Sequence, residues 1–110
     1  MDAVLDRDQL RDVTLDDAEL MREILSALID DTSRQVGLLN SAIREGDSQK
    51  CMRLAHYSKG ACANVGAHAA AAVLKNIERK AAERQFDACS ASLAALVQEV
   101  ERLRGEVATL

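Results

Sequence analysis

The sequence predicts an all-α fold, an antiparallel up-down four-helix bundle with a short extra helix at the N-terminus. Its 110 residues include no proline and only five glycines, and 48% of them are apolar. This composition favours helices over strands. Apolar residues also recur every three to four positions along four long segments that short connections join, as in bundles of amphipathic helices. The length suits a single domain, residues 1–110.

The first helix is expected within residues 2–13, with Asp6 as its cap, and should pack across one end of the bundle. Asp16 is predicted to cap the second helix, because Glu19 three residues later would complete a capping box. This helix should run for roughly seven turns and end near Gly46. Its apolar positions are Met21, Leu25, Leu28, Thr32, Val36, Leu39 and Ile43.

The third helix should begin after Asp47, which is its predicted cap. It should end at Gly66, since glycine readily adopts the left-handed conformation found after helix C-termini. Its inward positions are predicted to be Cys51, Leu54, Ser58, Ala61, Cys62 and Val65. His56 lies on the opposite face, so we expect its imidazole to point away from the core.

A fourth helix is expected from His68 to about Arg84. Its inward positions are Ala70, Val73, Leu74, Ile77 and Ala81, and the charged positions placed mostly outside are Lys75, Glu78, Arg79 and Lys80. Phe86 should lie in the next connection and plug one end of the core. The last helix is expected from about Asp87 to Glu106. Its inward positions are Leu93, Leu96, Val97, Val100, Leu103 and Val107.

The helical position of His56 suggests chemistry at its ring. At about 100° per residue, Lys59, Gly60 and Ala63 lie within about 60° of His56 around the helix. A glycine inside a helix costs roughly 1 kcal/mol relative to alanine, and its presence is explained if a bulky group must come close to the imidazole. The ammonium of Lys59 would stabilise an anion on that ring. The pattern favours a histidine that carries a phosphoryl group and is reached by another protein.

These residues resemble a known family. The segment His56-Tyr57-Ser58-Lys59-Gly60, followed by Gly66 and by the pair Ile77-Glu78, is similar to the signature of the histidine-containing phosphotransfer (HPt) domain of multistep two-component phosphorelays. The resemblance extends from about residue 16 to about residue 103. The chain departs from the family pattern at Ser58, where a large apolar residue is usual, and at Ala70, where leucine is usual.

The resemblance implies a function for the domain. His56 would accept a phosphoryl group, on its Nε2 atom, from a phospho-aspartate of a response-regulator receiver domain and pass it to another receiver. Lys59 would stabilise the phosphoryl charge, and Gly60 would give steric clearance. The domain would need no cofactor of its own, because the receiver supplies Mg²⁺. A hybrid histidine kinase is a further candidate partner.

The chain itself is expected to be a phosphorelay intermediate and not an enzyme, because it has no Gly-rich phosphate loop and no resemblance to an ATP-binding kinase site. A partner should dock on the surface around His56. The docking positions we predict there are Gln49, Met52, Arg53, Tyr57 and Ala63, beside Lys59 and Gly60. We expect a monomer, because the four-helix core accounts for most of the apolar surface.

Composition argues against other sites and partners. The cysteines, Cys51, Cys62 and Cys89, are odd in number and lack C-x-x-C spacing, so we expect buried thiols and neither disulfides nor zinc. His68 is expected to be exposed and structural. The net charge is −4 with no block of Lys or Arg, which disfavours nucleic acid and anionic membranes as partners. There is no apolar run of membrane-spanning length and no basic, apolar leader, so a cytoplasmic location is expected. The alternative is that the chain is one domain of a larger, membrane-bound protein.

Two other classes of function remain as alternatives. One is a non-catalytic helical dimerisation or scaffold module, in which His56 would be incidental. The other is a metal- or haem-binding bundle, which needs inward-facing ligands on several helices. With two histidines in the chain, one of them predicted to point outward, the second alternative is the weaker.

Overall fold

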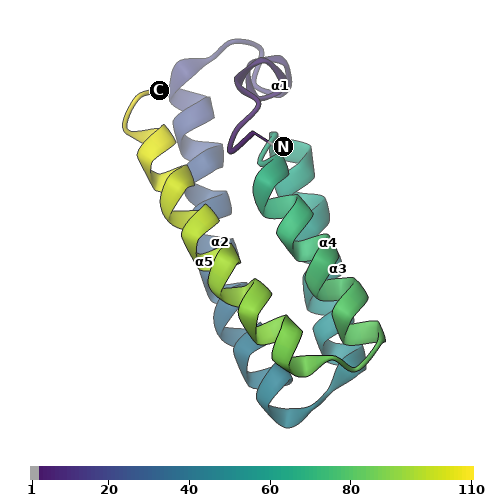
Figure 1. Cartoon of the computed structure of the whole chain (residues 1–110). Coiled ribbons are helices and arrows are strands. Elements are labelled where there is room, and N and C mark those ends of the chain that lie inside the picture. The colour runs from purple at the N-terminus through teal and green to yellow at the C-terminus, as the bar shows by residue number, and fades with distance from the viewer. Residues whose placement is uncertain (1–2) are drawn as a thin grey trace.

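The structure, a computed structural model, describes residues 3–110 and confirms the all-α fold. Four long helices form an antiparallel bundle of 42 × 21 × 20 Å, and a short helix lies across one end (Figure 1). The helices are α1 (Arg7–Val13), α2 (Ala18–Glu45), α3 (Ser48–Val65), α4 (His68–Ala82) and α5 (Phe86–Val107). At 1.5 Å per residue, the 28-residue α2 is about 42 Å long and spans the whole bundle.

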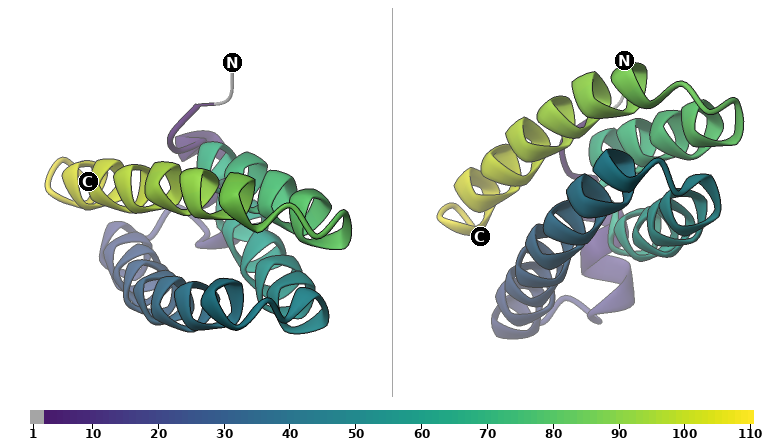
Figure 2. Two further views of the ribbon diagram at one scale, coloured as in Figure 1. Left: turned by 60° about the horizontal axis from the view of Figure 1, so that its bottom comes forward. Right: turned by 90° about the horizontal axis from the view of Figure 1, so that it is seen from below.

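Each long helix packs against two others, and the core fills the space between them. α3 packs against α2 and α4, whereas α5 packs against the same two helices from the other side. α3 and α5 therefore lie on opposite corners of the bundle, as the view from below shows (Figure 2, right). None of the helices in residues 3–110 has both the length and the apolarity needed to cross a membrane.

The predicted turns on either side of α3 are confirmed. Gly46 and Gly66 cap the C-termini of α2 and α3 with φ values of 66° and 96°. The Asp47 side chain accepts a hydrogen bond from the backbone N–H of Lys50 at 3.0 Å. These tight connections reverse the chain twice, so that α2, α3 and α4 run antiparallel to their neighbours.

The predicted cap of α2 was wrong by one residue. Asp17, not Asp16, accepts a hydrogen bond from the backbone N–H of Leu20, at 3.1 Å. Leu15 and Asp16 both have left-handed backbones, with φ values of 54° and 63°. Because these two residues turn the chain out of α1, helical geometry can only start after Asp17.

Three predictions near α5 also need correction. α4 ends at Ala82, two residues earlier than expected, because Arg84 has a left-handed φ of 57°. Phe86 is the first residue of α5 and not part of a connection, although it is half-buried and packs against the core as expected. Val97 was placed inside but is 44% exposed.

The third helix is buried over a different set of positions than predicted. Ala55, which was not expected inside, is fully buried, as are Cys51, Ser58 and Cys62. The predicted Leu54, Ala61 and Val65 are only half-buried. α3 packs against both α2 and α4. Which of its residues are buried therefore depends on two neighbouring helices, and a single stripe of apolar residues does not describe them.

All three cysteines are buried free thiols, as predicted. Burial is the main cause that raises the pKa of each of them, in the case of Cys62 to about 11. A thiol with so high a pKa remains protonated at neutral pH and is a poor nucleophile and metal ligand. These side chains act as small apolar core residues.

The short α1 is attached to the junction of α3 and α4. Asp6 caps α1 as predicted, and its backbone N–H donates to the carbonyl of Gly66 at 2.8 Å. Gln9 donates to the carbonyl of Ala63 at 2.6 Å, and its Oε1 lies 2.7 Å from Nε2 of His68. His68 is therefore partly covered by α1 and less exposed than predicted, while its contacts with Gln9 and Asp6 fit the predicted structural role.

Candidate functional site

His56 projects from the middle of α3 into solvent, as its helical position predicted. Its side chain is 70% exposed, while the neighbouring Ala55 and Ser58 are buried. An exposed histidine on a helix whose other side is packed into the core is held by a rigid backbone but is open to another molecule. The side chain is thus positioned for chemistry with an external partner.

One carboxylate joins His56 to Lys59. Glu78 on α4 places Oε2 at 3.0 Å from Nδ1 of His56 and Oε1 at 2.7 Å from Nζ of Lys59. Its side chain is only 24% exposed. The sequence placed Glu78 mostly outside and singled it out only as part of the Ile77-Glu78 pair, so its contact with the site was missed. The signal was faint: Glu78 is the only acidic residue between positions 48 and 82.

Glu78 is held in its charged form. The hydrogen bond from Lys59 is the main cause that lowers the pKa of this carboxyl group below its ordinary value of 4.5, with a smaller contribution from His56, and partial burial opposes the shift. At neutral pH the carboxylate can only accept hydrogen bonds. A neutral His56 must therefore donate from Nδ1, which leaves the lone pair on Nε2 pointing away from Glu78.

Lys59 has a different contact from the one that the sequence suggested. Its ammonium was predicted to stabilise charge on a phosphoryl group, and in this structure it binds Glu78. The side chain is 29% exposed and lies one turn from His56. It therefore holds the carboxylate that orients the imidazole while remaining close to the ring.

Gly60 leaves open space beside His56. A methyl group built at this position would have no heavy atom within 4 Å, apart from its chain neighbours and the backbone of its own helix. Packing within the described part of the chain therefore gives no reason for a glycine here, although glycine weakens a helix. Gly37 and Gly105 have the same free space, so the role of Gly60 in clearance stays a prediction.

The predicted docking residues are exposed to different degrees. Gln49, Arg53 and Tyr57 are exposed, whereas Met52 and Ala63 are half-buried and pack against the core. Those that lie on the His56 face of α3 are Gln49, Met52, Arg53 and Ala63. Tyr57 turns toward α2 instead, and its hydroxyl donates a hydrogen bond to Asp31 at 3.2 Å. The surface around His56 thus extends onto α2.

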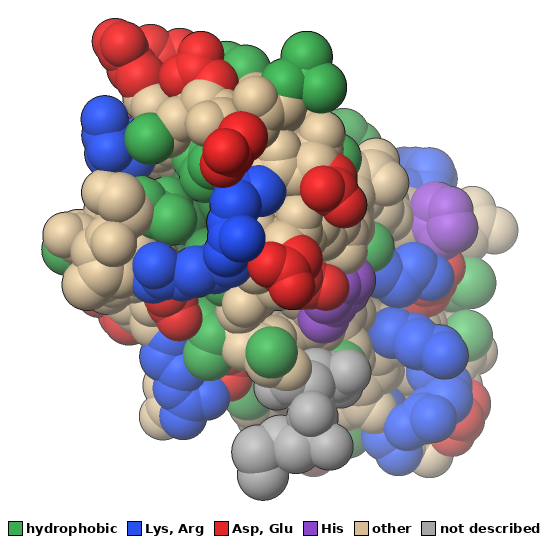
Figure 3. Space-filling model, turned by 90° about the horizontal axis from the view of Figure 1, so that it is seen from above, with side chains coloured by type: hydrophobic (Ala, Val, Ile, Leu, Met, Phe, Trp, Pro, Cys, Tyr) green, Lys and Arg blue, Asp and Glu red, His purple; other side chains and the backbone are tan. Residues whose placement is uncertain are grey.

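The helices that form the site are strongly basic. α3 and α4 together hold six of the 14 basic residues of the chain and one of its 18 acidic residues, Glu78. Seen from the end covered by α1, basic side chains lie beside one of the histidines on the α3 and α4 side (Figure 3). The modest net charge of −4 concealed this distribution, because the acidic residues lie mostly outside these two helices.

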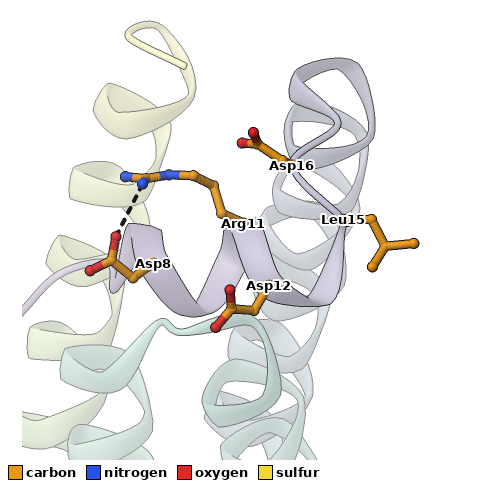
Figure 4. Close-up of a pocket in the computed structure, with 5 residues that line it drawn as sticks. All are labelled: Asp8, Arg11, Asp12, Leu15 and Asp16. Atoms are coloured by element: carbon orange, nitrogen blue, oxygen red, sulfur yellow. Dashed lines mark ion pairs between the residues drawn. The ribbon is translucent and has the colours of Figure 1, made fainter.

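A hollow at the junction of α1 and α2 is a separate feature. Its lining residues are Asp8, Arg11, Asp12, Leu15 and Asp16 (Figure 4). Arg11 forms an ion pair with Asp8 at 3.1 Å, and Leu15 is 90% exposed. None of these residues belongs to α3 or α4, so the hollow is no part of the His56 site. Within residues 3–110, no three His, Cys, Asp or Glu side chains are close enough to hold a metal ion.

Comparisons with known proteins agree with this geometry. The family model described as the Hpt domain matches residues 23–106, a range that contains His56, Lys59 and Glu78. The fold resembles the crystal structure of histidine-containing phosphotransfer protein B from Pseudomonas aeruginosa PAO1, with a TM-score of 0.87 and 23% identity over 96% of this chain and 92% of that one. It also resembles a rice protein assigned to the histidine-containing phosphotransfer proteins, with a TM-score of 0.86 and 20% identity over 97% of this chain and 79% of that one. Among curated proteins, none matches the sequence.

Proposed function

This chain belongs to the Hpt domain family, which carries phosphoryl groups on histidine in phosphorelay signalling, and we propose that His56 is its phosphoacceptor. The observation that carries the proposal is the contact between Nδ1 of His56 and the carboxylate of Glu78, at 3.0 Å. That contact leaves Nε2 as the free nucleophilic atom on an exposed side chain. His68, the other histidine, differs, because its Nε2 atom is already engaged, at 2.7 Å from Oε1 of Gln9 and 3.8 Å from a carboxylate oxygen of Asp6.

The transfer step is the attack of the Nε2 lone pair on the phosphorus of an aspartyl phosphate in a receiver domain. The new P–N bond forms as the bond between phosphorus and the aspartyl oxygen breaks, and the electron pair returns to the aspartate carboxylate. The Nδ1 proton stays on the ring and keeps its hydrogen bond to Glu78. Because the transition state of phosphoryl transfer is loose, positioning and charge stabilisation supply most of the catalysis.

Glu78 and Lys59 have complementary parts in this step. The ring of His56 becomes positively charged when Nε2 is phosphorylated while Nδ1 keeps its proton, and the carboxylate of Glu78 stabilises that charge. Glu78 acts through His56 and is a positioning residue. Lys59 stabilises the incoming phosphoryl oxygens and holds Glu78 in place.

The partner supplies the remaining chemistry. A receiver domain would bring the phosphorylated aspartate and the Mg²⁺ ion, and the chain itself would act as an intermediate without ATP-dependent kinase activity. The docking surface in this proposal consists of Gln49, Met52, Arg53, Tyr57 and Ala63 around the clearance provided by Gly60. We place the domain in the cytoplasm, where its receivers act, and expect it to work as a monomer.

The test mixes the purified chain with radiolabelled, phosphorylated receiver domains from the same organism. Wild-type protein and the control His68→Gln should acquire an acid-labile, base-stable label, whereas His56→Gln should not. Lys59→Ala should acquire the label more slowly, with an unchanged circular dichroism spectrum. If His56→Gln is labelled as fast as the wild type, the phosphoacceptor assignment is wrong. If no receiver transfers its phosphoryl group to the wild type, the scaffold alternative becomes the better explanation.

A further inference from the structure

The charge of the α3–α4 basic face is not neutralised by the protein itself. We give this name to the outward sides of these two helices, whose basic residues are Lys50, Arg53, Lys59, Lys75, Arg79 and Lys80. Within residues 3–110, Lys59 is the only one of the six with a carboxylate within 4.0 Å. The eight basic residues elsewhere behave differently, because five of them have such a partner. These five are Arg7, Arg11, Arg34, Arg102 and Arg104.

Two of these basic residues flank Glu78 on α4. Lys75 lies one helical turn before Glu78, and Arg79 directly follows it; both are exposed. Glu78 contacts His56, so the two side chains border the site without belonging to it. Arg79 also donates a hydrogen bond to Asn76 on the same helix, at 2.8 Å. Arg53 lies on the other side, one turn before His56 on α3.

We infer that Lys75 and Arg79 form a docking surface for an acidic face of the partner protein and select the receivers that reach His56. The inference rests on the proposed function and names the chemistry of its partner. A concentrated positive surface beside the reacting group increases the rate of encounter with an oppositely charged protein, by roughly tenfold to a thousandfold at low salt. The same charges repel receivers whose docking face is basic.

A compact acidic protein fits this surface better than a long polyanion such as nucleic acid. Outside α3 and α4 the chain holds 17 acidic and eight basic residues, so an extended polyanion would meet repulsion beyond the basic face. The chain also has only one tyrosine, one phenylalanine and no tryptophan to stack on bases. An acidic patch the size of one protein domain would contact the basic face alone.

The test compares two charge reversals of equal size. Lys75→Glu/Arg79→Glu changes the basic face, and Arg102→Glu/Arg104→Glu makes the same change on α5, which has no contact with α3. For each variant we would measure the single-turnover rate of phosphoryl transfer against receiver concentration, at low and at high salt. Binding of the unphosphorylated receivers would be measured separately by calorimetry, with a duplex DNA oligonucleotide as a second probe.

The α4 variant should show a second-order rate constant at least about tenfold lower at low salt, while the maximal transfer rate at saturating receiver stays within about twofold of wild type. High salt should remove most of the difference, and the α5 variant should behave like wild type. An unchanged second-order rate constant, an equal loss in the α5 variant, or a matching loss in the maximal rate would each overturn the inference.

The binding data separate this inference from the proposed function. Receivers that bind the wild type and lose affinity for the α4 variant, but transfer no phosphoryl group, would support the docking surface and contradict the phosphorelay role. Transfer that is insensitive to the α4 reversal would support the role and overturn the docking surface. The inference also fails if no receiver binds, or if the DNA oligonucleotide binds more tightly than every receiver.

Discussion

Nδ1 of His56 and Oε2 of Glu78 lie 3.0 Å apart although the two residues are 22 positions apart in sequence and belong to different helices. The contact depends on the turn at Gly66, which brings α4 back alongside α3. It determines which nitrogen of the imidazole carries the proton and which one is free to react. The orientation of the His56 imidazole is therefore a property of a helix pair.

Replacing Glu78 with Gln should slow transfer at saturating receiver by roughly tenfold to a hundredfold, the usual effect of losing a carboxylate that orients a histidine. The amide has nearly the same shape, but its NH₂ group can donate to Nδ1 and favour the tautomer that carries the proton on Nε2. Glu83→Gln, an exposed carboxylate at the end of α4, is the matched control. Nitrogen NMR of the His56 ring would report the tautomer directly. An unchanged tautomer together with an unchanged maximal rate would contradict the role of Glu78.

The same carboxylate should make stability depend on pH in a defined direction. The pKa of Glu78 in the folded protein is below the ordinary value of 4.5, so the folded state binds its proton less readily than the unfolded state does. Its contribution to the free energy of unfolding is then complete above pH 4.5 and is lost as the pH falls through the lower, folded-state value. For a partly exposed ion pair we expect about 1 kcal/mol or less.

Urea unfolding of wild type and Glu78→Gln, repeated from neutral to acidic pH, measures this contribution as the difference between the two proteins. The difference should be constant at neutral pH and should shrink in the acidic range. A difference that grows on acidification would show that the sign of the pKa shift is wrong.

Alanine at Gly60 should separate stability from function. Both Gly60 and Gly37 lie inside helices, and an added methyl group would meet no heavy atom within 4 Å at either position, helix backbone nearby aside. Each substitution by Ala should therefore raise the free energy of unfolding by roughly 0.5–1 kcal/mol. Only Gly60→Ala should slow transfer, because only Gly60 lies beside the imidazole. Substitution by Leu should increase the difference in transfer rate between the two positions. Equal transfer rates for Gly60→Leu and Gly37→Leu would contradict the clearance role of Gly60.

The two glycines that end α2 and α3 should differ in their tolerance of a side chain. Gly46 and Gly66 both have left-handed backbones, which cost an alanine roughly 1–2 kcal/mol. At Gly66 the new Cβ would also lie 2.8 Å from the carbonyl oxygen of Asp6, whereas at Gly46 it would only touch the ring of Phe86 at 3.9 Å. Gly66→Ala should thus be less stable than Gly46→Ala by about 1–3 kcal/mol in urea unfolding. Equal losses would mean that α1 moves away freely.

Local chemistry made much of the fold predictable. Gly46, Asp47 and Gly66 act within one turn of the chain, and their roles follow from glycine geometry and side-chain capping alone. The cap of α2 was misassigned because Leu15 and Asp16 adopt left-handed backbone conformations. Such conformations are uncommon for residues other than glycine, so the sequence did not predict them. The capping-box pattern favoured Asp16, but the path of the chain out of α1 makes Asp17 the cap.

The spacing of apolar residues could not predict which side chains are buried by contacts between helices. One apolar stripe describes a helix with one neighbour, but α3 has two, so Ala55 is fully buried while Leu54 remains partly exposed. His68 was taken for a surface residue because nothing in its own helix shows that Gln9 of α1 covers it. In each case the deciding neighbour lies on another element.

The sequence by itself determined the all-α fold, the helix-ending glycines and the outward direction of His56, because these depend on residue type and on a helical repeat of 3.6. It also supplied the motif from His56 to Gly60 that the family match supports. Only the tertiary structure placed Glu78 between His56 and Lys59 and set the basic helices α3 and α4 side by side around this site. Such contacts depend on the rotation and register of packed helices, which arise from the whole core and not from any one segment.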